Sequence, residues 1–224
     1  MSTPIAIVGA GGFAREVLQI ILDINDQSPQ APIWQPVGFI IEHGYSNPGT
    51  IHGLPVHTGL TWLSSHPEVQ TIIAIGAPSA RRQVALRLAE VCQNAFATLV
   101  HPRAWIGRHV EIGPGSVICA GSLLTTDISI GAHVQIHIGG TIGHDATLDD
   151  FATLYPSVKI SGNVHLGEGC EIGAGSVFIP KTHVGRWAVV GAGSVVTKPL
   201  PENTTAVGAP ARAIKTHPAN WHEG

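Results

Sequence analysis

A six-residue repeat in the C-terminal half constrains the fold of this chain more than any other feature. From Val100 to Pro201 the sequence divides into consecutive hexads in one phase, among them IGPGSV, IGAHVQ and IGAGSV. The first position is aliphatic in every hexad except the one that begins at Phe178, and the fifth position is usually small. Neither the 3.6-residue period of an α-helix nor the two-residue period of an ordinary strand produces this pattern.

The repeat predicts a parallel β-helix, in which each hexad supplies a short strand and a turn and directs one large apolar side chain inward. If three hexads form one triangular coil, residues eighteen apart in sequence stack at the spacing of neighbouring strands, about 4.8 Å. This arithmetic places Gly162 one coil beyond His144, and Tyr155 one coil beyond His137.

Residues 1–98 follow a different pattern. Apolar runs at 5–8, 37–41 and 71–75 predict strands, and the segments 14–24 and 79–90 predict helices. The alternation indicates an α/β domain of about half the size of a full dinucleotide-binding domain, so a mononucleotide-sized ligand is more plausible than NAD. We therefore expect an α/β domain at 1–98, a coil domain at 99–214 and a C-terminal tail at 215–224.

Composition and charge exclude several classes of protein. The 224 residues are 44% hydrophobic and 12% charged, which excludes disorder of the whole chain. A net charge of -3 gives no general attraction for nucleic acid or an anionic membrane. The sequence has neither a basic segment before its first apolar run nor eighteen consecutive apolar residues, and its three cysteines have no CxxC spacing. We expect a soluble cytoplasmic protein with no nucleic-acid or membrane partner.

A glycine-rich turn, GAGGFA at 9–14, lies between the first predicted strand and the first predicted helix. Backbone N–H groups can approach a phosphate at such a turn, although a tight turn without a ligand explains the same residues. Gly76 and Arg81 follow the third predicted strand and Glu42 follows the second, so all three belong to the carboxyl edge of the sheet, where ligands bind. Glu42 is either a hydrogen-bond acceptor for a ribose or sugar hydroxyl or an ordinary surface carboxylate.

His144 is the third residue of its hexad and is followed at once by Asp145. An imidazole oriented by a carboxylate, next to a glycine with an open N–H, has the parts of a general base and an oxyanion donor. The alternative is a surface His-Asp turn without chemistry. His137 and Tyr155 are expected to line the same cleft, unless His137 is only structural.

Two other chemistries are open to the coil. Histidines of hexapeptide coils can hold zinc between subunits, but no ligand spacing stands out here, and we expect no metal. Cys119 stacks one coil before His137 and Cys170 occupies a small position, so a covalent thiol route is conceivable. No third group is evident to orient such an imidazole, so the sequence favours buried thiols and direct transfer.

The segments IVGAGGFARE, LVHPRAWIG, TIGHDATLDDF and VVGAGSVVTKPLPENTTAVGAPARAI resemble the bacterial sugar acyltransferases of the left-handed β-helix type. This family includes nucleotide-linked amino-sugar N-acetyltransferases and sialic acid O-acetyltransferases. The resemblance implies a Rossmann-like half domain that binds a nucleotide-sugar, followed by a left-handed parallel β-helix of hexapeptide repeats. It also implies a homotrimer with active sites between neighbouring coils, acetyl-CoA along the prism, and a role in cell-surface polysaccharide biosynthesis.

Site residues follow from the resemblance position by position. His144 is similar to the general base, Asp145 to the acid that raises its basicity, and Gly162 to the backbone donor to the thioester oxygen. The other expected acetyl-CoA contacts are Thr153, Ala174, Gly191 and Ala192. The expected substrate contacts are Gly11, Gly12, Phe13, Glu42, Gly76, Arg81 and His137. Many relatives have histidine where this chain has Thr153 and asparagine where it has His137, so the acceptor can differ from theirs.

The sequence therefore predicts transfer of an acetyl group from acetyl-CoA to the amine of a nucleotide-linked amino-deoxysugar. The first alternative is an O-acetyltransferase acting on sialic acid or another sugar hydroxyl. A zinc-dependent hydratase on a hexapeptide coil and a non-catalytic nucleotide-sugar-binding protein are the others.

Overall fold

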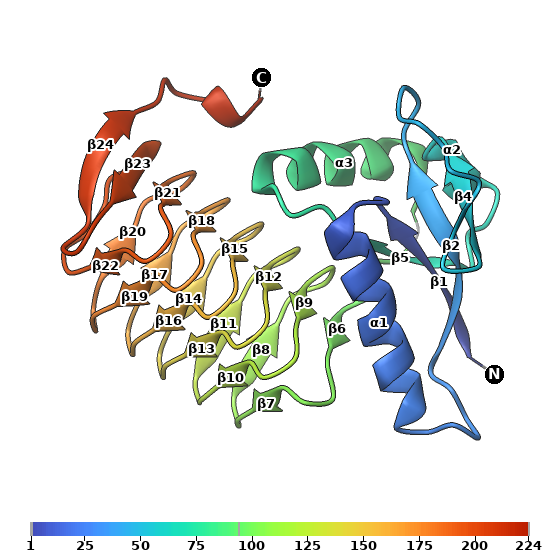
Figure 1. The fold of residues 1–224 in the computed structure, drawn as a ribbon, viewed down its shortest axis with the longest axis horizontal. Helices are drawn as coiled ribbons and strands as arrows, with labels where there is room; N and C mark the ends of the chain where they lie inside the picture. Colours follow the sequence, from blue (N-terminus) through green and yellow to red (C-terminus); the bar gives the residue numbers. More distant parts are fainter. Residues whose placement is uncertain (1, 94, 224) are drawn as a thin grey trace.

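The computed structural model describes residues 2–93 and 95–223, in which an α/β domain leads directly into a long triangular coil (Figure 1). The α/β domain contains β1 (Thr3–Val8), α1 (Gly12–Asp26), β2 (Trp34–Ile41), β3 (Thr50–Ile51), β4 (Leu54–Thr58), α2 (Thr61–Ser64), β5 (Gln70–Ile73) and α3 (Pro78–Val91). Its sheet has the order β3-β4-β2-β1-β5, and all neighbours are parallel except β3 and β4. The expected α/β class is confirmed.

The buried part of β1, residues 5–8, is entirely apolar because both faces of the strand are covered there. Ile5 and Ile7 pack with α1 and with the first coil, whereas Ala6 and Val8 pack with α3. Within the α/β domain, the elements that the sequence did not predict are the β3–β4 hairpin and the one-turn helix α2. In β4 only Val56 is buried, so the apolar alternation that marks a strand is absent there.

The coil consists of three flat parallel sheets, which we call its first, second and third faces. The first face contains β6 (Leu99–Val100), β9 (Val117–Ile118), β12 (Gln135–Ile136), β15 (Thr153–Leu154), β18 (Glu171–Ile172) and β21 (Val189–Val190). The second contains β7 (Trp105–Ile106), β10 (Leu123–Leu124), β13 (Thr141–Ile142), β16 (Lys159–Ile160), β19 (Val177–Phe178) and β22 (Val195–Val196). The third contains β8 (Val110–Ile112), β11 (Ile128–Ile130), β14 (Thr147–Leu148), β17 (His165–Leu166) and β20 (His183–Val184).

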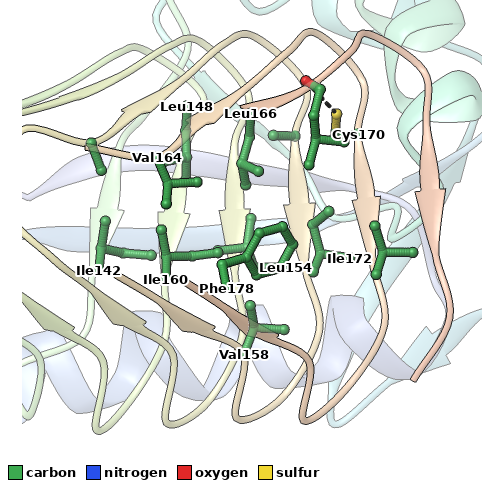
Figure 2. Packing of buried hydrophobic residues seen from close by; sticks show 14 of the residues in the cluster. Ile142, Leu148, Leu154, Val158, Ile160, Val164, Leu166, Cys170, Ile172 and Phe178 are labelled. Atoms are coloured by element: carbon green, nitrogen blue, oxygen red, sulfur yellow. Dashed lines mark hydrogen bonds between the residues drawn. The ribbon is translucent and has the colours of Figure 1, made fainter. Parts of the chain in front are cut away.

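The coil confirms the stacking rule of eighteen residues. Ile142 pairs with Ile160, and Ile160 with Phe178, each exactly one coil apart in the register of the second face. Their side chains point into the prism, where they meet Leu154 and Leu166 from the other two faces (Figure 2). Together with the α/β domain that precedes it, this coil has the architecture of a left-handed β-helix of hexapeptide repeats.

The turns of the coil have a period that the hexad pattern did not reveal. The fourth residue of each hexad from His109 to Gly193 has a positive φ, and glycine, asparagine or aspartate often stands there. These residue types tolerate the left-handed region best. Phe151 and Trp187 adopt it as well, at φ 61° and 56°. Polar, apolar and glycine residues all occur at this fourth position, so a search for periodic apolar residues does not detect it.

The C-terminal segment folds back toward α3. Strand β23 (Thr204–Val207) extends the first face and pairs antiparallel with β24 (Arg212–Thr216), before the short 3-10 helix η1 (Trp221–Glu223). The His222 ring stacks on Trp187 with centroids 3.7 Å apart, and Glu223 pairs with Arg82 of α3 at 3.6 Å. These contacts tie the far coils to the α/β domain. Among the helices that the structure describes, none combines the length and the apolar character needed to cross a bilayer.

Candidate functional site

The glycine-rich turn lies at the carboxyl edge of the parallel sheet. Gly9 has φ +117°, and a Cβ there would stand 3.0 Å from the Ala74 carbonyl oxygen, so this position accepts only glycine. By contrast, a Cβ at Gly11 or Gly12 would have no neighbour within 4 Å. Gly11 is the N-cap of α1 and supplies no side-chain cap, so the first N–H groups of α1 face an open edge.

Three rings close the junction between this turn and the coil. Phe13, in the first turn of α1, lies 4.5 Å from the ring of His137, and His137 lies 5.4 Å from Tyr155, as the stacking arithmetic predicts. His137 is only 8% exposed, and its Nε2 has no hydrogen-bond partner within the described ranges. Burial, aided by the Arg81 charge, lowers the pKa of His137 to about 4, so the imidazole is neutral at physiological pH. The Tyr155 hydroxyl donates to Glu171 Oε1 at 2.9 Å.

Arg81 was predicted to contact substrate, which stays a prediction, and the structure shows its guanidinium bound to groups of the protein itself. The side chain is fully buried between α3 and the coil. Its N–H groups donate, at 2.7–2.9 Å, to the carbonyl oxygens of Ile75, Gly76, His133 and Phe151 and to the hydroxyl oxygen of Thr153. A guanidinium has five N–H donors, and these five hydrogen bonds use all of them. Arg81 therefore holds the end of β5 against the coil.

Thr153 is also engaged within the protein. It is fully buried on the first face, and its hydroxyl accepts from Arg81 and donates to the Gly76 carbonyl oxygen at 3.1 Å. Its contact with acetyl-CoA stays a prediction. Glu42 does lie at the expected edge, directly after β2, but its Oε1 is held by Arg87 Nη2 at 2.6 Å. Of these two polar side chains, only Glu42 remains a predicted contact for a sugar hydroxyl.

The His144 dyad is assembled as the sequence predicts. His144 Nδ1 lies 2.6 Å from Asp145 Oδ2, and both side chains are more than half exposed, at 61% and 56%. Asp145 has a positive φ of 58°, as the fourth residue of its hexad. Because the carboxylate engages Nδ1, it favours the tautomer that leaves Nε2 free to accept a proton.

The imidazole of His144 lies directly against Gly162. A Cβ at Gly162 would stand 2.6 Å from His144 Nε2 and 2.7 Å from Cε1, closer than real side-chain contacts allow. In the described part of the chain, the Gly162 N–H donates to no backbone carbonyl. Gly162 is itself buried beneath the imidazole, so the site brings together a base atom and a backbone N–H that has no backbone acceptor, the two kinds of group that acyl transfer uses.

The remaining small positions lie at a different corner of the prism. Ala174 and Ala192 are exposed, and with Gly191 they belong to turns between the first and second faces. His144 and Gly162 belong to turns between the second and third faces. A single chain therefore does not gather the expected acetyl-CoA contacts at one place.

The two thiols of the coil, Cys119 and Cys170, are poor nucleophiles. Burial raises the pKa of both Cys119 and Cys170 to about 12, so neither is a thiolate at neutral pH. Cys170 donates to the Gly185 carbonyl oxygen, and Cys119 lies in the core beneath α1. Within the residues that the structure describes, no three His, Cys, Asp or Glu side chains come together as a metal site requires.

Sequence reasoning missed the partners that hold the α/β domain in place. His101 Nε2 binds Asp23 Oδ2 of α1 at 2.8 Å, across 78 positions of sequence. It also missed Glu171, which accepts from the Tyr155 hydroxyl within the coil, sixteen positions away. No short-range pattern marks the His101–Asp23 pair, because it forms only where α1 packs against the coil.

Two family models match the chain. The PglD N-terminal domain matches residues 4–88, and the bacterial transferase hexapeptide family (six repeats) matches residues 163–198. A GDP-perosamine N-acetyltransferase of Escherichia coli O157:H7 is 32% identical over 128 residues, which are 55% of this chain and 58% of that protein. Serine acetyltransferases are similar as well, and the chain spans 44% of the length of the one from Salmonella typhimurium, at 33% identity and over 60% of its own length.

Solved structures extend the similarity over both halves. Perosamine N-acetyltransferase of Caulobacter crescentus, in a complex with CoA and GDP-perosamine, superimposes with a TM-score of 0.84 at 25% identity, over 95% of this chain and 97% of that one. WeeI of Acinetobacter baumannii AYE superimposes with a TM-score of 0.81 at 30% identity, over 94% of this chain and 99% of that one. With its PglD-type N-terminal domain and its hexapeptide coil, this chain belongs to the bacterial sugar acyltransferase family of the left-handed β-helix type.

Proposed function

We propose that this protein transfers an acetyl group from acetyl-CoA to the amine of a nucleotide-linked amino-deoxysugar, without a covalent enzyme intermediate. The observation that carries the proposal is the His144–Asp145 dyad, whose imidazole lies against Gly162 on a coil of this family. The similarity to a perosamine N-acetyltransferase in complex with CoA and GDP-perosamine favours a GDP-linked sugar.

In this mechanism the sugar amine attacks the thioester carbon while His144 Nε2 removes one of its protons. Asp145 keeps the other ring nitrogen protonated and stabilises the imidazolium that forms. The N–H of Gly162 donates to the oxyanion of the tetrahedral intermediate, the new C–N bond replaces the C–S bond, and CoA leaves as the thiolate. A positioned base of this kind contributes about 10²- to 10⁴-fold to the rate.

The α/β domain is the proposed nucleotide-sugar-binding domain. Gly11 and Gly12 leave the N-terminus of α1 open to a diphosphate, and Glu42 is positioned to accept from a hydroxyl. Phe13 supplies an apolar wall, and His137 Nε2, which has no hydrogen-bond partner in the described part of the chain, supplies a neutral polar group beside it.

The proposed assembly is a homotrimer with active sites between copies. The support for a trimer is that the predicted site residues lie at two different corners of one prism, His144 at one and Ala174 and Ala192 at another. These two corners can form one site only when they come from two neighbouring chains. The outward side chains of the second face also support a trimer, because apolar residues are exposed there. Trp105, Leu123 and Val177 expose 57%, 45% and 38% of their surface.

The test is CoA thiol release from acetyl-CoA by the purified protein with GDP-perosamine, UDP- and dTDP-linked 4-amino sugars, and free sialic acid. Rapid release with one amino sugar is the expected result. Release with sialic acid alone would instead support O-acetylation. That outcome is open because this chain has His137 and Thr153 where many relatives have other residues, so its acceptor can differ from theirs. Binding of an amino sugar without any thiol release would overturn the proposal in favour of a non-catalytic binding protein.

A further inference from the structure

Arg81 is a buried cation that has no carboxylate partner among the described residues. It is fully buried, and none of the ion pairs among the described residues includes it. Its five acceptors are neutral carbonyl and hydroxyl oxygens. The acidic group whose charge reaches it is Glu171, which accepts a hydrogen bond from Tyr155 instead. A buried charge of this kind is normally paired, because desolvation is costly.

The charge lies at the edge of the sheet to which the glycine turn belongs. Arg81 Nη1 donates to the Ile75 and Gly76 carbonyl oxygens, directly after β5, and β5 is the neighbour of β1. Two helices, α1 and α3, begin at this edge. Neither helix has an acidic residue in its first turn or a side-chain cap, so both present the positive ends of their dipoles there.

We propose that the Arg81 charge selects an anionic ligand at this edge, the diphosphate group of a nucleoside diphosphate, without touching it. This inference rests on the proposed function and deepens it, because it explains a preference for a nucleotide-linked sugar over a free one. The guanidinium has no N–H donor left for the ligand, so its charge acts on the ligand at a distance. The buried protein groups around Arg81 screen this electrostatic attraction less than water would. Arg81 is then a positioning and specificity residue rather than a catalytic one.

Charge and hydrogen bonding can be separated by two variants. Arg81→Met removes the charge and the five hydrogen bonds, whereas Thr153→Val removes one hydrogen-bond partner of Arg81 and keeps the charge. Calorimetry measures the Kd of GDP, UDP and dTDP and of the uncharged nucleosides guanosine, uridine and thymidine for each protein. Arg81→Met is expected to weaken the preferred diphosphate about tenfold. The affinity of Arg81→Met for the matching nucleoside should stay within about threefold of wild type. Thr153→Val should preserve the ratio of diphosphate affinity to nucleoside affinity.

Glu171→Gln provides a second variant that does not disturb the buried contact, since Glu171 is only half-buried and glutamine still accepts from Tyr155. Removing this carboxylate leaves the Arg81 field less compensated, so diphosphate affinity should rise about two- to fivefold while nucleoside affinity stays constant. This variant decides the question if Arg81→Met fails to fold by circular dichroism.

Several results would overturn the inference. These are an unchanged diphosphate-to-nucleoside ratio in Arg81→Met, an equal loss in Thr153→Val, no tightening in Glu171→Gln, or no diphosphate binding by the wild type. Normal acetyl transfer by the wild type, together with an unchanged diphosphate-to-nucleoside affinity ratio in Arg81→Met, would contradict this inference alone. Absence of thiol release with every amino sugar, when the affinity ratio does depend on Arg81, would instead contradict the proposed function.

Discussion

Substituting Gly162 by alanine tests the contact on which the proposed chemistry depends. The new Cβ would stand 2.6 Å from His144 Nε2, where an ordinary contact begins at 3.4 Å, so the base atom must retreat by about 0.8 Å. A displacement of that size at a reacting group costs about 10²-fold in rate. We therefore expect kcat to fall about a hundredfold in Gly162→Ala.

Stability should change little in this variant. The His144 side chain is 61% exposed and can rotate into solvent. Alanine also stands at the same hexad position elsewhere in the coil, as in Ala174 and Ala192. The free energy of unfolding is expected to fall by less than about 1 kcal/mol, which thermal unfolding measures.

A double variant separates the collision from any other effect of the methyl group. His144→Ala alone should lose about 10²- to 10⁴-fold in kcat. Adding Gly162→Ala to it should cause no further loss, because no ring remains to be displaced. Steady-state thiol release measures all three proteins. A kcat within about threefold of wild type in Gly162→Ala, or equal further losses in both backgrounds, would refute the reasoning.

Two further predictions concern the domain junction and the thiols. Hydrogen bonds from Gln19 and His101 lower the pKa of Asp23 below 3.8, so Asp23 stabilises the fold above that pH and loses its effect as pH falls through its folded pKa. Asp23→Ala should thus cost about 1 kcal/mol at pH 7, and the difference in Tm from wild type should shrink as the pH falls below 3.8. At pH 7.5, an alkylating reagent should modify Cys92 in the native protein and spare Cys170, whose thiol has a pKa of about 12; mass spectrometry of peptides checks this, and rapid native-state labelling of Cys170 would contradict it.

The sequence predicts the coil well because its repeat converts position directly into geometry. His144 meets Gly162, and His137 meets Tyr155, one coil apart as counting indicates. It also places the glycine turn at the correct edge, since strand and helix patterns on either side are strong there.

What the sequence could not predict depends on how the two halves pack. A fully buried arginine has the same sequence signature as an exposed one, so the five hydrogen bonds of Arg81 and the burial of Thr153 were not foreseen. The same holds for the Arg87 partner of Glu42. Polar residues whose contacts span more than about forty positions carry no local pattern, and only the assembled interface assigns them.

The most direct test of the central claim is to analyse the sugar product formed from acetyl-CoA and GDP-perosamine by the wild-type protein. The account predicts that the sugar nucleotide gains one acetyl group as an amide on its amino nitrogen, stable to hydroxylamine, and that His144→Ala forms this product at least about a hundredfold more slowly. An acetyl ester that hydroxylamine removes, or the same rate of amide formation without the His144 imidazole, would contradict it.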